Sequence, residues 1–321
     1  MNKARRLVIL LAWATALAAC ADRPMDPLQD EAPAADWVRV DAQSAVQAEH
    51  PAQEYIHRVN ERLAAEGKGL AIARAEWLLA PGSRARMSTV FAADRQLRLD
   101  TRWVPGDPRR DAAGNNLTHA TFLPLALANG VTHATAAIRS SFETWEALPC
   151  FQLDLIERQL APNIFPSAVL AIAGFSNDPF AADISTVGFL PPFIFDAVLG
   201  PGASEFVLGV TFTFVFIAGP GGPASDIDGD GRDDTALKEI WYNDGFSWTT
   251  TGGSGIDIET VALHENGHAL ELGHFGRIAV NRANMLTVSP RAVMNAIILG
   301  TQRSLLGTDE ASLCGEFGNW P

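Results

Sequence analysis

The sequence predicts an α+β fold in which helices and strands pack around one core. Apolar residues make up 47% of the 321 residues, a share typical of a globular protein. Apolar side chains recur at helical spacing over residues 52–65, whereas residues 70–79 and 96–104 have the pattern of strands. A further helix is expected after Asp257, whose carboxylate suits the N-cap position. Both element types therefore contribute to the predicted core.

The first 36 residues have the features of an exported lipoprotein. Residues 1–19 form a signal peptide, in which three basic residues precede an apolar stretch too short to span a bilayer. The stretch ends in Leu-Ala-Ala-Cys20, which resembles a bacterial lipobox and implies a lipid-anchored Cys20. Ala21 after this cysteine favours the outer membrane, on either its periplasmic or its outer face. Residues 20–36 indicate a flexible tether. The alternative is ordinary cleavage beside a cysteine that stays free.

Three of the seven histidines lie in the run His264-Glu-Asn-Gly-His-Ala-Leu-Glu-Leu-Gly-His274. On a helix, positions i and i+4 are about 40° apart around the axis and about 6 Å apart along it. His264 and His268 therefore direct two imidazoles at one metal ion, and Glu265 flanks the open coordination position. His274 can join them only if the helix ends before it, and Gly273 is a natural break. The alternative is an amphipathic helix with surface histidines.

At these residues the chain resembles the metzincin zinc endopeptidases, and specifically their matrixin-like branch. The family pattern is HExxHxxGxxH, followed by a turn that places a methionine under the metal. The resemblance implies Zn²⁺ held by the three histidines, Glu265 as general base, and Met294 as the turn methionine, with Met285 as a second candidate. Glu271 stands where the family has glycine. Left-handed geometry costs a non-glycine residue roughly 1–2 kcal/mol, so either Glu271 bears that strain or the break shifts to Gly273.

The resemblance covers residues 116–321 and implies a catalytic domain with a twisted mixed sheet, a zinc helix, a methionine turn and a C-terminal helix. The strand before the zinc helix is expected to pair with an extended polypeptide substrate, and the segment after Met294 to line the specificity pocket. The matching segments are a first helix at 135–153, strands from about 151, at 206–214 and at 238–243, and a closing helix at 308–317 with Thr308 as its N-cap.

Residues 37–115 are expected to form a small α/β accessory region before the catalytic domain. A turn-rich segment at 105–116 marks its end. Matrixin propeptides often block zinc with a cysteine thiolate, and residues 37–115 contain no cysteine. We therefore expect this region to stay attached as an accessory region.

The cysteines predict one disulfide. With Cys20 lipidated, Cys150 and Cys314 remain, and an even pair in an oxidising compartment favours a bridge between them. Two buried free thiols are the alternative.

The acidic loop at residues 226–234 is a second candidate metal site. It places oxygen donors at positions 1, 3, 5 and 9 of a calcium loop, but position 12, where a bidentate glutamate belongs, is a leucine. We expect a partial Ca²⁺ site, with a solvated acidic turn as the alternative. The four candidate ligands are Asp226, Asp228, Asp230 and Asp234.

These observations together predict a zinc-dependent endopeptidase that acts on polypeptides. The formal net charge of −13 argues against a nucleic-acid partner. A non-catalytic metal-binding envelope lipoprotein, acting as a binding or assembly module, is the alternative, although a purely structural site has no need of Glu265.

A zinc site completed by a later glutamate is disfavoured because none lies at the usual distance. The sequence does not predict the oligomeric state. The histidines without ligand spacing, expected at surface or core positions, are His50, His57, His119 and His133.

Overall fold

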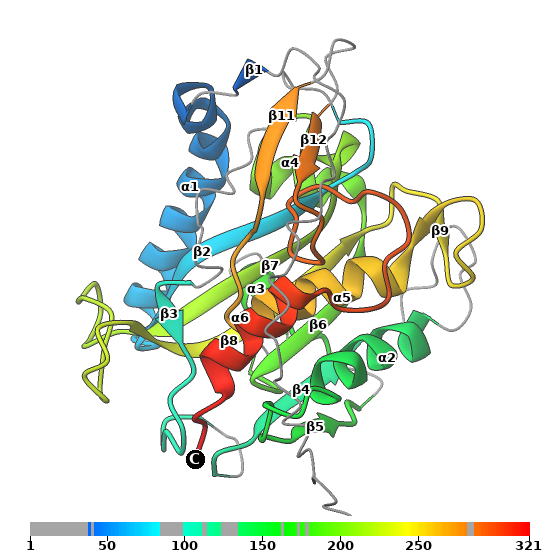
Figure 1. Ribbon diagram of the computed structural model, residues 1–321. Helices are drawn as coiled ribbons and strands as arrows, with labels where there is room; N and C mark the ends of the chain where they lie inside the picture. The colour runs from blue at the N-terminus through cyan, green and yellow to red at the C-terminus, as the bar shows by residue number, and fades with distance from the viewer. Residues whose placement is uncertain are drawn as a thin grey trace, which may run out of the picture. The chain divides into compact units, whose positions relative to one another are not determined.

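The protein is described from a computed structural model in which residues 35–321 form one compact unit (Figure 1). Cys20, Met285 and the first part of the predicted strand 96–104 lie outside the described residues. The described residues are 38–39, 42–83, 99–110, 114–122, 134–161, 164–171, 174–176, 180–280 and 286–321.

A mixed β-sheet forms the centre of the fold, with the strand order β2-β7-β8-β6-β4-β5. Strand β7 is antiparallel to both of its neighbours, whereas β8, β6, β4 and β5 are parallel to one another. The short strand β3 (Thr101–Arg102) pairs with the start of β8. The bounds are β2 Leu70–Leu79, β4 Leu117–Thr121, β5 Leu155–Arg158, β6 Ile184–Leu190, β7 Val207–Phe216 and β8 Asp233–Asn243.

Helices cover both faces of this sheet, each over its own apolar cluster (Figure 1). One cluster joins α2, α5 and α6 to the sheet, and the other joins α1, α3 and α4 to the opposite face. The helices are α1 Ala42–Ala65, α2 Ala134–Glu146, α3 Ala168–Ala171, α4 Pro192–Leu199, α5 Ile258–Ala269 and α6 Gly307–Phe317, with a 3₁₀ turn at Ala203–Glu205.

Two small sheets complete the described elements. Strand β11 pairs with both β1 and β12, and β9 pairs with β10 just before α5. No helix in the described ranges is long and apolar enough to cross a membrane. These strands are β1 Val38–Arg39, β9 Trp248–Thr249, β10 Ile256–Asp257, β11 Arg277–Val280 and β12 Leu286–Ser289.

The alternation of side chains along β7 decides what each face of the sheet presents. Val210, Phe212 and Phe214 point into the cluster with α1 and α4. Thr211, between them, points to the opposite face, where it meets α5. Strand β7 therefore buries bulky apolar side chains on one face and turns Thr211 toward α5 on the other, where neighbouring strands add apolar residues.

The mixed architecture is consistent with the predicted α+β class, and the predicted strand 70–79 is confirmed. The first helix predicted at 135–153 is α2, which ends at Glu146 because Pro149 disfavours helical geometry just before it. The following strand accordingly starts at Leu155. The predicted N-cap at Thr308 is wrong, since Leu306 takes that position.

The two strands predicted before the zinc helix, at 206–214 and 238–243, correspond to β7 and β8, and their expected pairing with a polypeptide substrate stays a prediction. Strand β8 lies inside the sheet between β6 and β7, so both of its edges are paired. The other edge of β7 is covered as well, by β2 from the N-terminal region.

Candidate metal centre

Helix α5 is held in a fixed position along its length. Its start is capped as predicted, since the Asp257 carboxylate accepts a hydrogen bond from the backbone N–H of Thr260 at 2.9 Å. Trp145 donates its indole N–H to the Leu263 carbonyl at 2.9 Å. Trp103 does the same to the Ala269 carbonyl near the other end, also at 2.9 Å.

The helix ends in a left-handed turn at Glu271, whose φ is 64°. The backbone N–H of Leu272 donates to the Gly267 carbonyl at 2.9 Å, and that of Glu271 donates to the His268 carbonyl at 3.1 Å. These two hydrogen bonds form a Schellman motif, a common helix C-terminus in which the left-handed residue is usually glycine. Of the two predicted alternatives, Glu271 therefore bears the strained geometry, and the break does not shift to Gly273.

The Glu271 side chain has a role that glycine could not fill. Its carboxylate accepts hydrogen bonds from the hydroxyls of Thr101 at 2.6 Å and Thr235 at 2.5 Å. It also pairs with the Lys238 ammonium at 3.0 Å, and both side chains are fully buried. Burial lowers the pKa of Lys238, and the charge of Glu271 opposes that shift. The turn that leads to His274 is thus tied to the sheet through a buried ion pair.

The three predicted histidines converge. The Nε2 atom of His268 lies 3.0 Å from Nε2 of His264 and 3.1 Å from Nε2 of His274. Each ring offers one nitrogen to a common point, which makes this a cluster that could hold a metal ion. The left-handed turn at Glu271 is what brings the third ring back to the helix.

The tautomers of His264 and His268 follow from the hydrogen bonds of their Nδ1 atoms. Nδ1 of His264 lies 2.7 Å from the Val293 carbonyl oxygen, and Nδ1 of His268 lies 2.7 Å from that of Leu272. Because a carbonyl oxygen only accepts, both Nδ1 atoms carry the hydrogen and both Nε2 atoms present lone pairs. These lone pairs face each other across 3.0 Å, an arrangement that repels unless a cation lies between them.

Burial disfavours a proton in this position. Burial lowers the pKa of His264 to about 3, an effect to which His274 adds, and burial lowers the pKa of His268 well below its ordinary value. A tetrahedral zinc ion, about 2.0–2.1 Å from each nitrogen, holds its ligands about 3.3 Å apart. The observed spacing and the neutral imidazoles therefore fit Zn²⁺.

Glu265 lies beside this cluster, fully buried between α5 and β7. The Thr211 hydroxyl donates to its Oε2 at 2.6 Å, while Oε1 has no hydrogen-bond partner among the described residues. A Cβ atom at Gly209 would lie 2.7 Å from Oε1, so only glycine leaves room for this carboxylate. Burial raises the pKa of Glu265 well above its ordinary value; the Thr211 hydrogen bond opposes the rise and Glu76 adds to it.

Met294, to which the resemblance assigns the turn position, lies against α5 at Gly267. It is fully buried, and a Cβ atom at Gly267 would fall 2.3 Å from its sulfur. The Asp309 carboxylate of α6 accepts hydrogen bonds from the backbone N–H groups of Val293 at 2.9 Å and Met294 at 3.2 Å. The disulfide between Cys150 and Cys314, predicted from the cysteine count, joins α6 to the loop that follows α2.

A pocket opens beside His264 on the side of the methionine turn. The segment after Met294 supplies most of its wall, together with Thr260 of α5 and Leu78 of β2. The lining residues from that segment and the turn are Ala292, Val293, Asn295, Ile297, Ile298, Leu299, Gly300 and Gln302.

Sequence reasoning missed three residues around the centre. Gly209 had a signal, because a glycine inside a strand often marks a close approach of another group. Lys238 and Glu76 had none, since they meet the motif only through pairing of distant strands. The Glu76 carboxylate lies 3.3 Å from Nδ1 of His268 and 3.9 Å from Nδ1 of His274.

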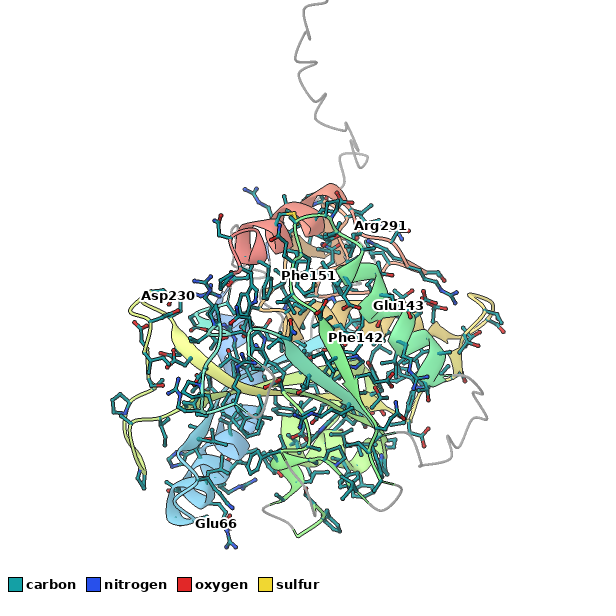
Figure 2. All side chains as sticks on the ribbon, turned by 90° about the horizontal axis from the view of Figure 1, so that it is seen from below. Glu66, Phe142, Glu143, Phe151, Asp230 and Arg291 are labelled. Atoms are coloured by element: carbon teal, nitrogen blue, oxygen red, sulfur yellow. A yellow bond between two sulfur atoms is a disulfide. The ribbon has the colours of Figure 1, made fainter. Side chains whose placement is uncertain are left out.

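The acidic loop brings together three of its four predicted ligands, Asp226, Asp228 and Asp234. The fourth, Asp230, lies on the outer loop between β7 and β8 and pairs with Arg102 at 2.9 Å (Figure 2). Asp234 is buried and already accepts hydrogen bonds from Arg109 at 2.7 Å and Ser225 at 2.5 Å. The predicted four-aspartate arrangement is thus incomplete because arginine side chains pair with two of its carboxylates.

Comparisons with known proteins do not assign a family. No protein-family model matches the sequence, and no curated protein is significantly similar to it.

Proposed function

We propose that the chain is a zinc-dependent endopeptidase of the metzincin type. The observation that carries the proposal is the pair of Nε2 lone pairs of His264 and His268, 3.0 Å apart, with His274 as third donor and Glu265 alongside. The order of a mixed sheet, the helix with His264 and His268, the turn at Met294 and a C-terminal helix also supports the proposal. Export and a lipid anchor at Cys20 belong to the same proposal and rest on the sequence.

Zinc, when bound, would polarise the scissile carbonyl and lower the pKa of a water molecule. Glu265 would accept a proton from that water and return it to the leaving amine. Burial raises the pKa of Glu265 above its ordinary value, and a raised pKa makes its carboxylate a stronger base. The Thr211 hydroxyl fixes one carboxylate oxygen and leaves the other for the water.

A non-catalytic metal site is the second candidate, because the three rings and Glu265 are almost completely buried. A structural site would be expected to have four protein ligands. The described residues place three imidazoles in the cluster and, next to them, a carboxylate oxygen without a partner. This arrangement favours catalysis.

The test measures zinc content and peptide hydrolysis on the same preparations of the full chain. We expect one zinc per chain in the parent and in Glu265→Gln, and casein hydrolysis reduced by about 10²–10⁴-fold in the variant. His264→Ala should lose both the metal and the activity. Mass spectrometry of the metal and cleavage of a peptide library provide the readouts.

Glu259→Gln is the matched control, since Glu259 lies on the same helix and bonds to Ser140 and Arg303 away from the rings. Its hydrolysis rate should stay within about twofold of the parent. Equal hydrolysis by Glu265→Gln would remove the proposed general base. Zinc binding without hydrolysis by any form of the chain, including a variant in which the pairing of β2 is weakened, would favour the structural role.

A further inference from the structure

Strand β2 of the N-terminal region runs along the outer edge of β7, beside the metal centre (Figure 1). It pairs antiparallel with β7 from Leu70 opposite Phe216 to Leu79 opposite Val207. At its end it meets a second partner, because Leu79 forms a parallel bridge with Ile297, in the segment that follows the methionine turn.

Two backbone hydrogen bonds define this second contact. The N–H of Leu79 donates to the Ala296 carbonyl at 3.0 Å, and the N–H of Ile298 donates to the Leu79 carbonyl at 3.1 Å. Strand β2 is therefore hydrogen-bonded on both sides near the centre, to β7 on one side and to the pocket wall on the other. An extended peptide bound between two such edges would make the same type of bonds.

The side chains of β2 also enter the site. Glu76 and Leu78 share the face that meets α5, since they are two residues apart on a strand. The Glu76 carboxylate lies 3.3 Å from Nδ1 of His268. Leu78 is 2% exposed and lines the pocket beside His264.

The consequence is a metal centre that a polypeptide cannot reach while β2 is in place. His264 is 1% exposed, and His268 and Glu265 are fully buried. Strand β7 has no free edge to offer, because β8 pairs with its other side.

We infer that β2 occupies the position of an extended peptide substrate, so that residues 70–79 act as an intramolecular ligand of the groove and keep the centre latent. The inference rests on the proposed peptidase function. The block needs no cysteine, since strand pairing and the Leu78 side chain supply it.

A ligand that competes with β2 reveals this arrangement directly. The probe is a peptide hydroxamate with a leucine-type side chain, added to the zinc-loaded full chain and followed by hydrogen exchange of backbone amides. Binding of the probe should accelerate exchange in residues 72–79 by about tenfold or more, because the strand must leave the groove. The amides of β6, inside the sheet, should stay unchanged and serve as the internal reference.

Leu78→Ala and Leu70→Ala form a matched pair of variants, since both truncate a buried leucine of β2. Only Leu78 lines the pocket; Leu70 lies at the far end of the strand, opposite Phe216. Apparent affinity scales with the fraction of chains in which the groove is open. Leu78→Ala should therefore bind the hydroxamate and cleave peptides about tenfold better than the parent, while Leu70→Ala stays within about twofold.

The possible results distinguish failure of this inference from failure of the proposed peptidase function. A zinc-loaded chain that binds the probe or cleaves peptides with unchanged exchange in β2 overturns the occupancy of the groove and leaves the peptidase proposal intact. Equal affinity in parent and Leu78→Ala, or no binding to either, also overturns it. A chain that binds no zinc and cleaves no peptide overturns the proposed function, and the inference with it.

Discussion

Glu271 offers the sharpest test of the left-handed turn, because it stands where the metzincin pattern that the chain resembles has glycine. Substitution by glycine removes left-handed strain of roughly 1–2 kcal/mol. It also leaves the fully buried Lys238 ammonium without its partner, and a buried charge that loses its partner costs about 3–5 kcal/mol. The hydroxyls of Thr101 and Thr235 lose their acceptor as well. We therefore expect Glu271→Gly to lower the free energy of unfolding by about 3 kcal/mol.

A second substitution isolates the ion pair. Lys238→Met replaces the ammonium by an apolar group of similar length, and buried ion pairs replaced by apolar groups are often as stable as the original. The double variant Glu271→Gly/Lys238→Met should therefore recover most of the loss. Lys238→Met alone leaves the buried Glu271 carboxylate without its cation, so the coupling energy from the double-mutant cycle should be about 3 kcal/mol or more.

The assay is urea unfolding at pH 7 in the presence of a chelator, so that metal binding does not contribute to the free energy. The comparison covers the parent, both single variants and the double variant. It requires that all four unfold with the same denaturant slope (m-value), so that a shift in midpoint reports a change in stability. A Glu271→Gly variant more stable than the parent would show that backbone strain outweighs the ion pair. A double variant no better than Glu271→Gly would refute the role given to Lys238.

Two further predictions test burial in the core. Burial lowers the pKa of His119 to about 4 from an ordinary value of 6.5, so the unfolded chain takes up this proton first and stability falls as the pH drops from 6.5 to 4. His119→Leu should reduce this loss of unfolding free energy by about 3 kcal/mol. Urea unfolding of the parent and the variant at pH 7 and pH 4 measures the loss. An equal loss in both proteins would contradict the prediction. Gly267→Ala places a Cβ 2.3 Å from the Met294 sulfur and should lower the free energy of unfolding by about 1–2 kcal/mol. An additional Met294→Ala change should make the alanine at 267 tolerable, and a Gly267→Ala protein as stable as the parent would rule out the close contact.

Local features of the site could be predicted because helical geometry is local. The spacing of His264 and His268 places their rings on one side of α5 whatever surrounds the helix, and Asp257 caps the helix through a bond to Thr260 only three residues away. The strand at 70–79 was likewise evident from its pattern. The convergence of His274 was a conditional prediction, since it depended on a turn whose position had two solutions.

The strand pairing that covers the site could not be predicted, because it joins segments more than a hundred residues apart. Pattern alone shows that residues 70–79 form a strand; it does not show that they take the outer edge of β7 and bring Glu76 to the rings. Arg102, equally remote in sequence, pairs with Asp230 and removes it from the acidic cluster.

The residues of the chain thus determined which groups form the candidate site, three imidazoles and one carboxylate, and the short-range geometry of α5 and its cap arranged His264, Glu265 and His268. The tertiary structure alone decided their surroundings. It provides the Lys238 partner that stabilises Glu271 in a left-handed turn, and the strand that fills the groove, because both depend on contacts between segments that are brought together only when the sheet forms.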